Sequence, residues 1–363
     1  MRVKLKDITK FSKGTQINGK NLIDDGAYSY LNGGINPSGK WNEFNVSENT
    51  VTISEGGNSS GYVNYMNDAF WCGAHCYYLY DGPKNSKYLY YALKSQQERL
   101  FRIRSGACMP NIKKSDLGNF IIEYEKDEVR QEEVVKVLEK CELLIEDYNK
   151  KLTLLDEAVR ARFVEMFGDL RINDKGWKYY KLDELTELIT DGEHATPKRT
   201  TQGIYLLSAR NVLNHQLSLE DVDFIDCDEF DRISRRIIPK EGDVLISCSG
   251  SIGRCCIVPK NIKFQMVRSI ALLRFKSNIN PVFAEYMITS DYLQNQINKS
   301  KTASSQANLF RGKIKSLKGV VPPLELQNQF ASFVQEIDKS RLRELLAIKQ
   351  IKLLLNDSWL LLY

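Results

Sequence analysis

The chain has 363 residues, which is enough for two or three domains that each bury a core. Its hydrophobic content of 42% and charged content of 27% are those of an ordinary soluble globular protein. No apolar run approaches the roughly 20 residues of a membrane span, and the N-terminus lacks the apolar region of a signal peptide. We therefore expect a cytoplasmic protein with no membrane partner.

The net charge of +5 is unevenly distributed along the chain. Residues 1–126 carry 16 Lys/Arg against 12 Asp/Glu, and residues 169–322 carry 23 against 18. Residues 127–168 carry 7 against 11, and residues 323–363 balance at 5 against 5. Two basic segments thus alternate with two that are not basic, which suggests a chain organised in two halves.

Short segments recur in the same order in both halves. Leu5–Ile8 is echoed by Leu182–Leu185, and Tyr91–Ser95 is echoed by Tyr286–Ser290. Gly14, Gly57 and Gly61 correspond to Gly192, Gly250 and Gly253. A long period repeated only twice predicts two homologous domains, which we place at residues 1–126 and 169–322. In the first domain, the Asn/Gly/Ser-rich stretch from Asn32 to Gly61 is expected to be largely loop.

A long helix is predicted after the first domain, within residues 127–168. Its apolar residues alternate at spacings of four and three, the pattern of a coiled-coil seam. The seam positions are Val134, Leu138, Cys141, Ile145, Tyr148, Leu152, Leu155 and Val159. The stretch from Asp127 to Val159 would be about 50 Å long at 1.5 Å per residue.

The second domain has clearer strand signals than the first. Short apolar runs punctuated by glycine and proline occur at 204–207, 243–246, 255–258 and 270–275. Residues from Pro281 to Ile297 are predicted to form one helix with an apolar face.

The segment 323–363 is predicted to be a distal long helix that opens at Pro322-Pro323. Its less regular apolar stripe consists of Phe330, Val334, Ile337, Leu345, Ile348 and Leu355. The simplest fold is α+β: two homologous mixed α/β domains separated by two long helices packed as an antiparallel coiled coil, with the domains at opposite ends. The seam could instead pair with another protein.

Each predicted domain contains a window without acidic residues. Residues 99–115 hold Arg99, Arg102, Arg104, Lys113 and Lys114, and residues 292–324 hold Lys299, Lys301, Arg311, Lys313, Lys315 and Lys318. Basic side chains without compensating carboxylates are typical of phosphate contacts, although a solvated surface would look the same in either window alone. Their equivalent places in the repeat favour nucleic acid.

Several passages in order resemble the specificity (S) subunits of type I restriction–modification systems. These passages include 162–169, 190–198, 207–212, 242–253 and 314–327, and the resemblance is strongest from Arg162 to Gln329. The resemblance implies two target-recognition domains that each read one half of a bipartite double-stranded DNA site. It also implies helices that set the spacer and dock two DNA adenine methyltransferase subunits, joined by two motor-nuclease (restriction) subunits.

Such a subunit has no catalytic residues of its own and binds no cofactor. S-adenosylmethionine, ATP and Mg²⁺ are expected on the partner subunits, and the seam residues are expected to serve in the helical pairing or in partner docking.

Candidate base readers are polar side chains near glycines, because Arg pairs with guanine and Asn or Gln with adenine. In the first domain these are Lys13, Gln16, Asn32, Asn58, Ser59, Asn111 and Lys113. In the second they are His194, Thr196, Lys198, Ser208, Arg210, Asn211, Ser249, Ser251, Arg254, Gln306, Asn308 and Arg311. Any one of them could instead cap a turn.

Other chemistries have weaker support. The segments 14–21 and 34–41 follow the spacing of a phosphate-binding loop but lack the Ser/Thr that would hold magnesium, so we interpret them as turns. Cys72 and Cys76 lack a second ligand pair for zinc, so buried free thiols are favoured there and at Cys255-Cys256. The competing hypothesis is a coiled-coil scaffold whose globular domains bind proteins.

Overall fold

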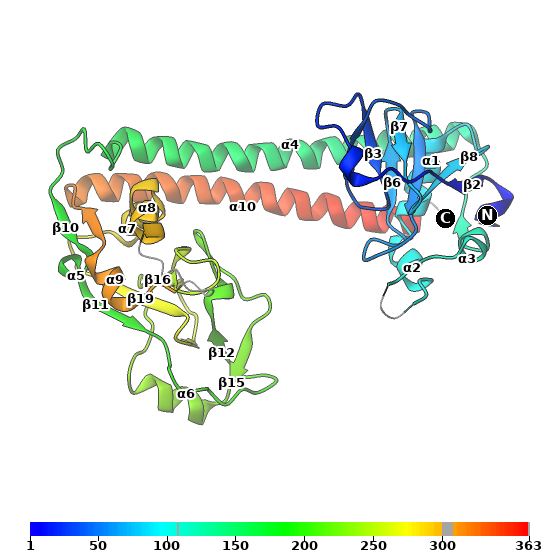
Figure 1. Ribbon diagram of the computed structural model, residues 1–363. Coiled ribbons are helices and arrows are strands. Elements are labelled where there is room, and N and C mark those ends of the chain that lie inside the picture. The colour runs from blue at the N-terminus through cyan, green and yellow to red at the C-terminus, as the bar shows by residue number, and fades with distance from the viewer. Residues whose placement is uncertain (107–108, 300–307, 362–363) are drawn as a thin grey trace. The chain divides into compact units, whose positions relative to one another are not determined.

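The computed structural model describes residues 1–106, 109–299 and 308–361, which fall into two compact units (Figure 1). One unit comprises Met1–Asn149 together with the chain from Leu345 onward, and the other comprises Lys150–Glu344. Each unit therefore contains one globular domain and a part of each long helix. Among the described residues, no helix is both long and apolar enough to cross a membrane.

The first domain begins with a run of short strands, which short helices and a last strand follow. Its strands are β1 (Arg2–Lys4), β2 (Lys10–Lys13), β3 (Tyr28–Leu31), β4 (Gly39–Trp41), β5 (Thr50–Ser54), β6 (Val63–Met66), β7 (Phe70–Cys72), β8 (Cys76–Tyr80) and β9 (Ile121–Glu123). Its helices are α1 (Ser86–Lys94), α2 (Gln97–Arg102) and α3 (Lys114–Gly118).

The second domain follows the same plan. Its strands are β10 (Tyr179–Lys181), β11 (Thr186–Asp191), β12 (Ile204–Leu207), β13 (Val212–Leu213), β14 (Gln216–Leu217), β15 (Asp223–Ile225), β16 (Val244–Ser247), β17 (Cys255–Ile257), β18 (Phe264–Met266), β19 (Ile270–Phe275) and β20 (Lys318–Val320). Its helices are α5 (Leu182–Leu185), α6 (Cys227–Ser234), α7 (Pro281–Thr289), α8 (Asp291–Lys299) and α9 (Arg311–Ser316).

The two domains share one sheet topology. The larger antiparallel sheet has the order β2-β8-β5-β6 in the first domain and β11-β19-β16-β17 in the second. The smaller mixed sheet has the order β4-β3-β7 in one and β15-β12-β18 in the other, with a parallel pair at the same place. An antiparallel ribbon of β1 with β9, or β10 with β20, closes each domain. The predicted duplication is therefore confirmed in these three sheets, and among the described residues the second domain adds the β13–β14 hairpin.

Residues 32–61 are largely loop, as predicted, but they also contain strands β4 and β5. Every residue of β5 is buried between β6 and β8. The threonines and the serine weaken the apolar signal of the run Thr50-Val51-Thr52-Ile53-Ser54, although its β-branched residues suit a central strand.

The helix predicted from Pro281 to Ile297 is broken at Ser290. Ser290 has an extended backbone (ψ 151°), and α7 ends before it while α8 begins after it. The Ser290 hydroxyl donates to the Met287 carbonyl, and the Gln294 side chain donates to the Ile288 carbonyl. Side chains that satisfy the final carbonyls of α7 make the break stable.

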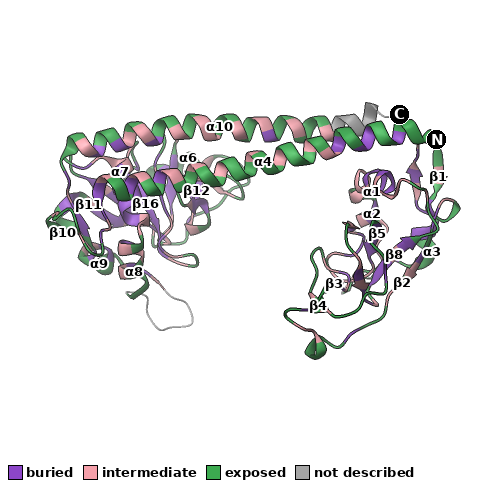
Figure 2. Ribbon diagram, turned by 90° about the horizontal axis from the view of Figure 1, so that it is seen from above, coloured by how far each residue is buried: buried purple, intermediate pink, exposed green. Residues whose placement is uncertain are grey.

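The long helix α4 (Glu128–Phe167) confirms the predicted seam and continues beyond it. All eight predicted seam positions, from Val134 to Val159, are buried or half-buried, whereas most positions between them are exposed. Figure 2 shows this alternation of buried, intermediate and exposed residues along the helix. The 4-3 spacing thus describes the face that α4 buries.

The second long helix, α10 (Leu324–Leu361), has a more regular seam than its sequence suggests. Phe330, Val334 and Ile337 lie in the seam as predicted, but the inclusion of Leu345 was wrong because Leu345 is 53% exposed. The polar residues Arg341 and Glu344 occupy the intervening seam positions and are half-buried. Arg341 forms ion pairs with Asp156 of α4 and Asp338, which explains how a guanidinium is accommodated there.

Both long helices contribute to the core of each unit. In the second unit, Phe163 and Phe167 of α4 contact Phe330 of α10, with ring centroids 5.4 and 5.5 Å apart. In the first unit, Leu355 of α10 packs against the cluster that contains Leu138 of α4. In each unit, residues late in one helix meet residues early in the other, so the predicted antiparallel pairing is confirmed.

A buried glutamine near the start of each long helix repeats the same contact. The side-chain amide of Gln131 donates to the Glu125 carbonyl at 2.6 Å, and that of Gln327 donates to the Pro322 carbonyl at 2.8 Å. These bonds fix how each domain enters the helix that follows it.

A glycine after the first strand of the larger sheet is required in both domains. A side chain at Gly14 would overlap the Cys72 carbonyl, and one at Gly192 would overlap the Met266 carbonyl. Cys72 and Met266 end the equivalent strands β7 and β18, so the same close backbone approach occurs twice.

Phe167→Ala should destabilise the second unit, because the ring is fully buried against Phe163 and Phe283. We expect the free energy of unfolding to fall by about 3–5 kcal/mol, measured by urea denaturation. Val164→Ala is the control on the same helix, since Val164 is 52% exposed. Equal effects of the two substitutions would contradict the proposed packing.

Gly14→Ala should lower the free energy of unfolding of the first unit by about 2–3 kcal/mol or more, because backbone must move to admit the methyl group. Gly19→Ala is the control, since a Cβ there has no neighbouring atom within 4 Å among the described residues. Hydrogen exchange of the first domain would report the difference, and unchanged protection in Gly14→Ala would disprove the close approach.

Candidate nucleic-acid interface

Polar side chains of the first domain gather where the strands of the larger sheet end. Lys13, the last residue of β2, forms an ion pair with Glu55, which directly follows β5 (Nζ–Oε1 2.7 Å). His75, just before β8, lies on the other side of the same carboxylate (Nδ1–Oε2 3.4 Å). Lys13, Glu55 and His75 form what we call the first cluster.

Several other predicted residues surround the first cluster. The Asn32 side chain accepts a hydrogen bond from the His75 amide, and the Ser59 hydroxyl donates to the Gly33 carbonyl. Asn111 pairs with Gly56 through a β-bridge, which brings the loop before α3 beside the loop after β5. Residues distant in sequence thus form one surface around Glu55.

The remaining candidates of the first domain lie at its surface. Asn58 is exposed on the loop after β5, and Lys113 is exposed directly before α3. The Gln16 amide donates to the neighbouring Ile17 carbonyl, so this side chain is partly used by its own loop.

The second domain builds a cluster at the equivalent strand ends. Asp191, the last residue of β11, binds His194 (Oδ2–Nε2 2.8 Å) and Arg236 (Oδ1–Nη2 2.8 Å). Partial burial alone would raise the pKa of the Asp191 carboxyl, but a backbone hydrogen bond, Arg236 and His194 together hold it below its usual value. Asp191 stands where the first domain has Lys13, so the charge is inverted at an equivalent position.

The loops around this second cluster are joined as in the first domain. Ser249 pairs with Asn308 through a β-bridge that matches the one between Gly56 and Asn111. The Ala209 amide donates to the Ser269 hydroxyl, just before β19, and the Leu309 amide donates to the Cys248 carbonyl, just after β16. The loops that carry Ser208 and Asn308 therefore border the neighbouring ends of β16 and β19.

Other candidates of the second domain have different environments. Ser251 and Arg311 are exposed, and Arg254 is half-buried. Thr196 and Lys198 are exposed, and the Lys198 amide donates to the Glu229 carboxylate, whose pKa is lowered to about 2 mainly by Arg232. Gln306 lies outside the described residues.

One prediction needs correction. Asn211 is fully buried, and its amide group bonds the Ser208 amide and the carbonyls of Ser218 and Glu220, so it stabilises a turn and offers no reading surface. Arg210 is exposed and forms ion pairs with the carboxylates of Asp221 and Asp223.

Glu55, His75 and Arg268 also lie at these surfaces, although they are not among the candidates predicted from the sequence. Glu55 is an acceptor whose partners Lys13 and His75 lie far away in the sequence. Arg268 is exposed between β18 and β19, next to the second cluster, where its amide donates to the Glu193 carbonyl. Its place in the short connection between two strands was the signal that could have revealed it.

The acid-free windows lead into these surfaces. In the first domain, Arg104 lies over the ring of Phe101, with 4.0 Å from its guanidinium carbon to the ring centroid, a few residues before Asn111. In the second domain, Arg311 and Lys313 lie on α9, which begins three residues after Asn308. Basic side chains therefore lie close in sequence to the bridging asparagine of each domain, where phosphate contacts would be expected.

The four cysteines predicted to be buried free thiols are buried. Cys72, Cys76, Cys255 and Cys256 are buried and unpaired, and the neighbouring Cys76 together with burial raises the pKa of Cys72. In the part of the chain that the structure describes, no group of three or more His, Cys, Asp or Glu side chains is arranged to hold a metal ion.

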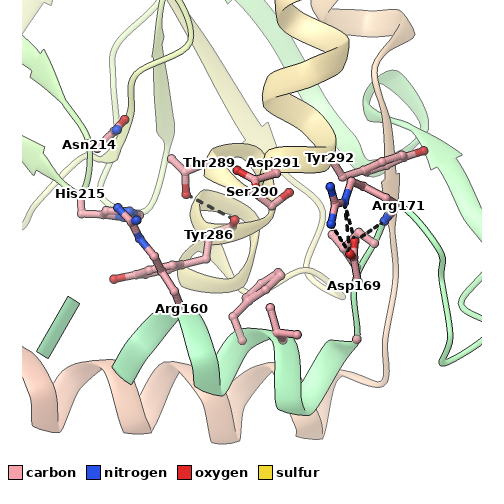
Figure 3. A pocket seen from close by; sticks show the side chains of 14 residues that line it. Arg160, Asp169, Arg171, Asn214, His215, Tyr286, Thr289, Ser290, Asp291 and Tyr292 are labelled. Atoms are coloured by element: carbon pink, nitrogen blue, oxygen red, sulfur yellow. Dashed lines mark hydrogen bonds and ion pairs between the residues drawn. The ribbon is translucent and has the colours of Figure 1, made fainter. Parts of the chain in front are cut away.

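A cavity of about 370 Å³ lies at the end of α4, where the second domain joins the helices (Figure 3). On one side Asp169 binds Arg171, with 2.6 Å between Oδ2 and Nη2, and on the other the His215 ring stacks on Tyr286. His215 also approaches Glu285, whose pKa is raised by burial. The Asp169–Arg171 pair is local, the His215–Tyr286 stack joins two parts of the second domain, and the residues Asp191, His194 and Arg236 do not line this cavity.

Comparisons with known proteins agree with this architecture. The chain matches the type I restriction modification DNA specificity domain twice, over residues 1–155 and 174–353. A type I specificity subunit from Mycoplasma pneumoniae is 32% identical over 50% of this chain and 56% of its own length. One from Mycoplasma genitalium is 32% identical over 48% of this chain and 52% of its own. The matches thus span about half the length of these curated relatives.

Solved structures show the same fold. The crystal structure of a type I restriction–modification S subunit from M. genitalium has a TM-score of 0.61 at 19% identity, covering 99% of this chain and 94% of that one. A chain from a structural study of complex assembly and conformational transition in a type I system has a TM-score of 0.51 at 14% identity, covering 99% and 96%. Because the specificity-domain match covers most of the sequence, this chain belongs to the type I restriction modification DNA specificity family.

Proposed function

We propose that the chain is the non-catalytic DNA-specificity subunit of a type I restriction–modification complex. Each domain reads one half of a bipartite double-stranded DNA site, and the long helices set the spacer and dock methyltransferase subunits. The observation that carries the proposal is the polar cluster built twice at equivalent strand ends with different side chains. The names of the curated relatives support the same role.

The clusters have the chemistry needed for reading base pairs. Exposed donors and acceptors such as His75, Asn58 and His194 lie on loops, and backbone hydrogen bonds hold these loops against the strands. Side chains held in this way can contact base edges, while the neighbouring Arg and Lys residues contact phosphates. A conserved frame with different readers suits two different half-sites.

The helix α4 can act as a spacer because it is continuous over 40 residues, or about 60 Å at 1.5 Å per residue. Successive major-groove faces recur every 34–36 Å, so a strut of this length can separate two readers by more than one turn of DNA.

The long helices also offer surfaces for partners. Large apolar side chains lie exposed on α4 at Val137, Leu143, Leu144 and Leu154, and on α10 at Leu342, Leu345, Leu346, Leu353 and Leu354. Apolar surface that the chain leaves uncovered is typical of protein interaction sites. We assign it to two methyltransferase subunits and place the motor-nuclease subunits, with S-adenosylmethionine, ATP and Mg²⁺, on the partner side of the complex.

Exchanging residues 169–322 for those of a relative with a different target should change one half of the methylated sequence and leave the other half intact. Each domain carries its own cluster, so the two halves of the DNA site should change independently of each other. Sequencing of methylated DNA from cells with the chimaera and the methyltransferase would test this. An unchanged site would refute the proposal, whereas the scaffold alternative predicts no dependence on this domain.

Leu346→Glu combined with Leu353→Glu should weaken methyltransferase binding at least about tenfold, because both side chains point away from the seam and a docked carboxylate would be buried. Co-purification of the two subunits measures the loss. Gln335→Glu is the control, since it adds a carboxylate at an exposed position of α10 before the run of exposed leucines from Leu342 to Leu354. Undiminished co-purification of the double variant would exclude this face of α10.

A further inference from the structure

We propose that Glu55 reads an exocyclic amino group, cytosine N4 or adenine N6, within the half-site of the first domain. This inference rests on the proposed function and gives one residue of the first cluster a specific chemistry. It differs from the prediction that donors such as Lys13 do the reading, because Glu55 is a pure acceptor when ionised.

The backbone of Glu55 is fixed from three sides. Its amide donates to the His75 carbonyl at 2.8 Å, and its carbonyl accepts from the Ile112 amide at 2.9 Å and the Ser60 hydroxyl at 2.7 Å. These bonds join the loops after β5, before β8 and before α3. A side chain anchored in this way has a defined position before any ligand arrives, which favours specific recognition.

The side chain of Glu55 is partly shielded but still reachable, with 16% of its surface exposed. Lys13 donates to one carboxylate oxygen and His75 lies beside the other. An ionised carboxylate offers about four lone-pair positions, so acceptor capacity remains for a third donor. Lys13 offsets the negative charge that would otherwise repel DNA phosphates.

This arrangement contributes little to folding. The side chains of Lys13 and His75 are 43% and 61% exposed, so removing the Glu55 carboxylate leaves no buried charge without a partner. Exposed ion pairs of this kind are weak in proteins. The Asp191 cluster is different, because Arg236 also donates to the Gly192 carbonyl and the Thr190 hydroxyl and so secures the end of β11.

The chemistry of base edges explains what such a carboxylate selects. In the major groove, cytosine and adenine present an amino donor, whereas guanine presents the acceptors O6 and N7, and thymine the acceptor O4. A carboxylate therefore attracts the first two bases and repels the others. One good contact of this type discriminates by about ten- to hundredfold between bases.

The test uses the full chain in complex with its methyltransferase subunits. Glu55→Gln keeps the shape but adds an amide donor, so guanine or thymine should become acceptable at one position of the half-site read by the first domain. Sequencing of methylated DNA should show that single position relaxed at least about tenfold, with the other half-site unchanged.

The matched control is Asp81→Asn. Asp81 pairs with Lys10 at the opposite end of the β2–β8 pair, and its side chain is 60% exposed, so the same chemical change is made away from the cluster. Both half-sites should stay unchanged. If Glu55→Gln also leaves both half-sites unchanged, the inference is overturned although the proposed function stands.

If the Glu55→Gln complex no longer methylates DNA, its affinity is measured for oligonucleotides that carry each of the four bases at each position of the half-site. A discrimination ratio that collapses at one position supports base reading by Glu55. An equal loss of affinity for all four bases overturns it, because the residue would then serve only structure or phosphate contacts. A wild-type complex without any bipartite site would instead refute the proposed function.

Discussion

The structure depends on the burial of both long helices within the cores of both units. The aromatic cluster of Phe163, Phe167, Phe283 and Phe330 contains rings from α4, from α7 of the second domain and from α10. In the first unit, Leu138 and Leu355 bring the same helices into the other core. Neither domain completes its core without the helices, so each domain and the helix segments packed against it share one hydrophobic core. This explains why the repeat includes the helix as well as the domain.

A second constraint fixes the strand ends where the polar clusters lie. Gly14 and Gly192 let two backbone segments approach each other more closely than any side chain permits. The loops that follow are then tied by equivalent β-bridges in both domains. On this common frame the side chains diverge, with Lys13 in one domain and Asp191 in the other. A rigid frame that tolerates such an exchange of charge suits a family in which the target changes while the fold persists.

The sequence predicted periodic features well and individual contacts poorly. The α4 seam follows from spacing alone, because a buried helical stripe must repeat at 4-3 intervals. The α10 seam was harder to predict, because Arg341 fills a half-buried seam position that hydropathy assigns to solvent, and Leu345 is exposed where hydropathy predicts burial. Asn211 and Asn308 look alike in sequence, yet only the fold shows that the first serves a turn. Glu55 could not be recognised because its partners lie 42 and 20 residues away and meet it only in the folded domain.

The central claim is that one recognition unit is used twice to read two half-sites at a fixed separation. The most direct test is to map methylated adenines across the genome of cells that express the wild-type chain with its methyltransferase subunit. The account predicts a single motif made of two short specific sequences separated by a gap of constant length and no sequence preference. A contiguous motif, a gap of variable length, or methylation unaffected by removing the chain would contradict it.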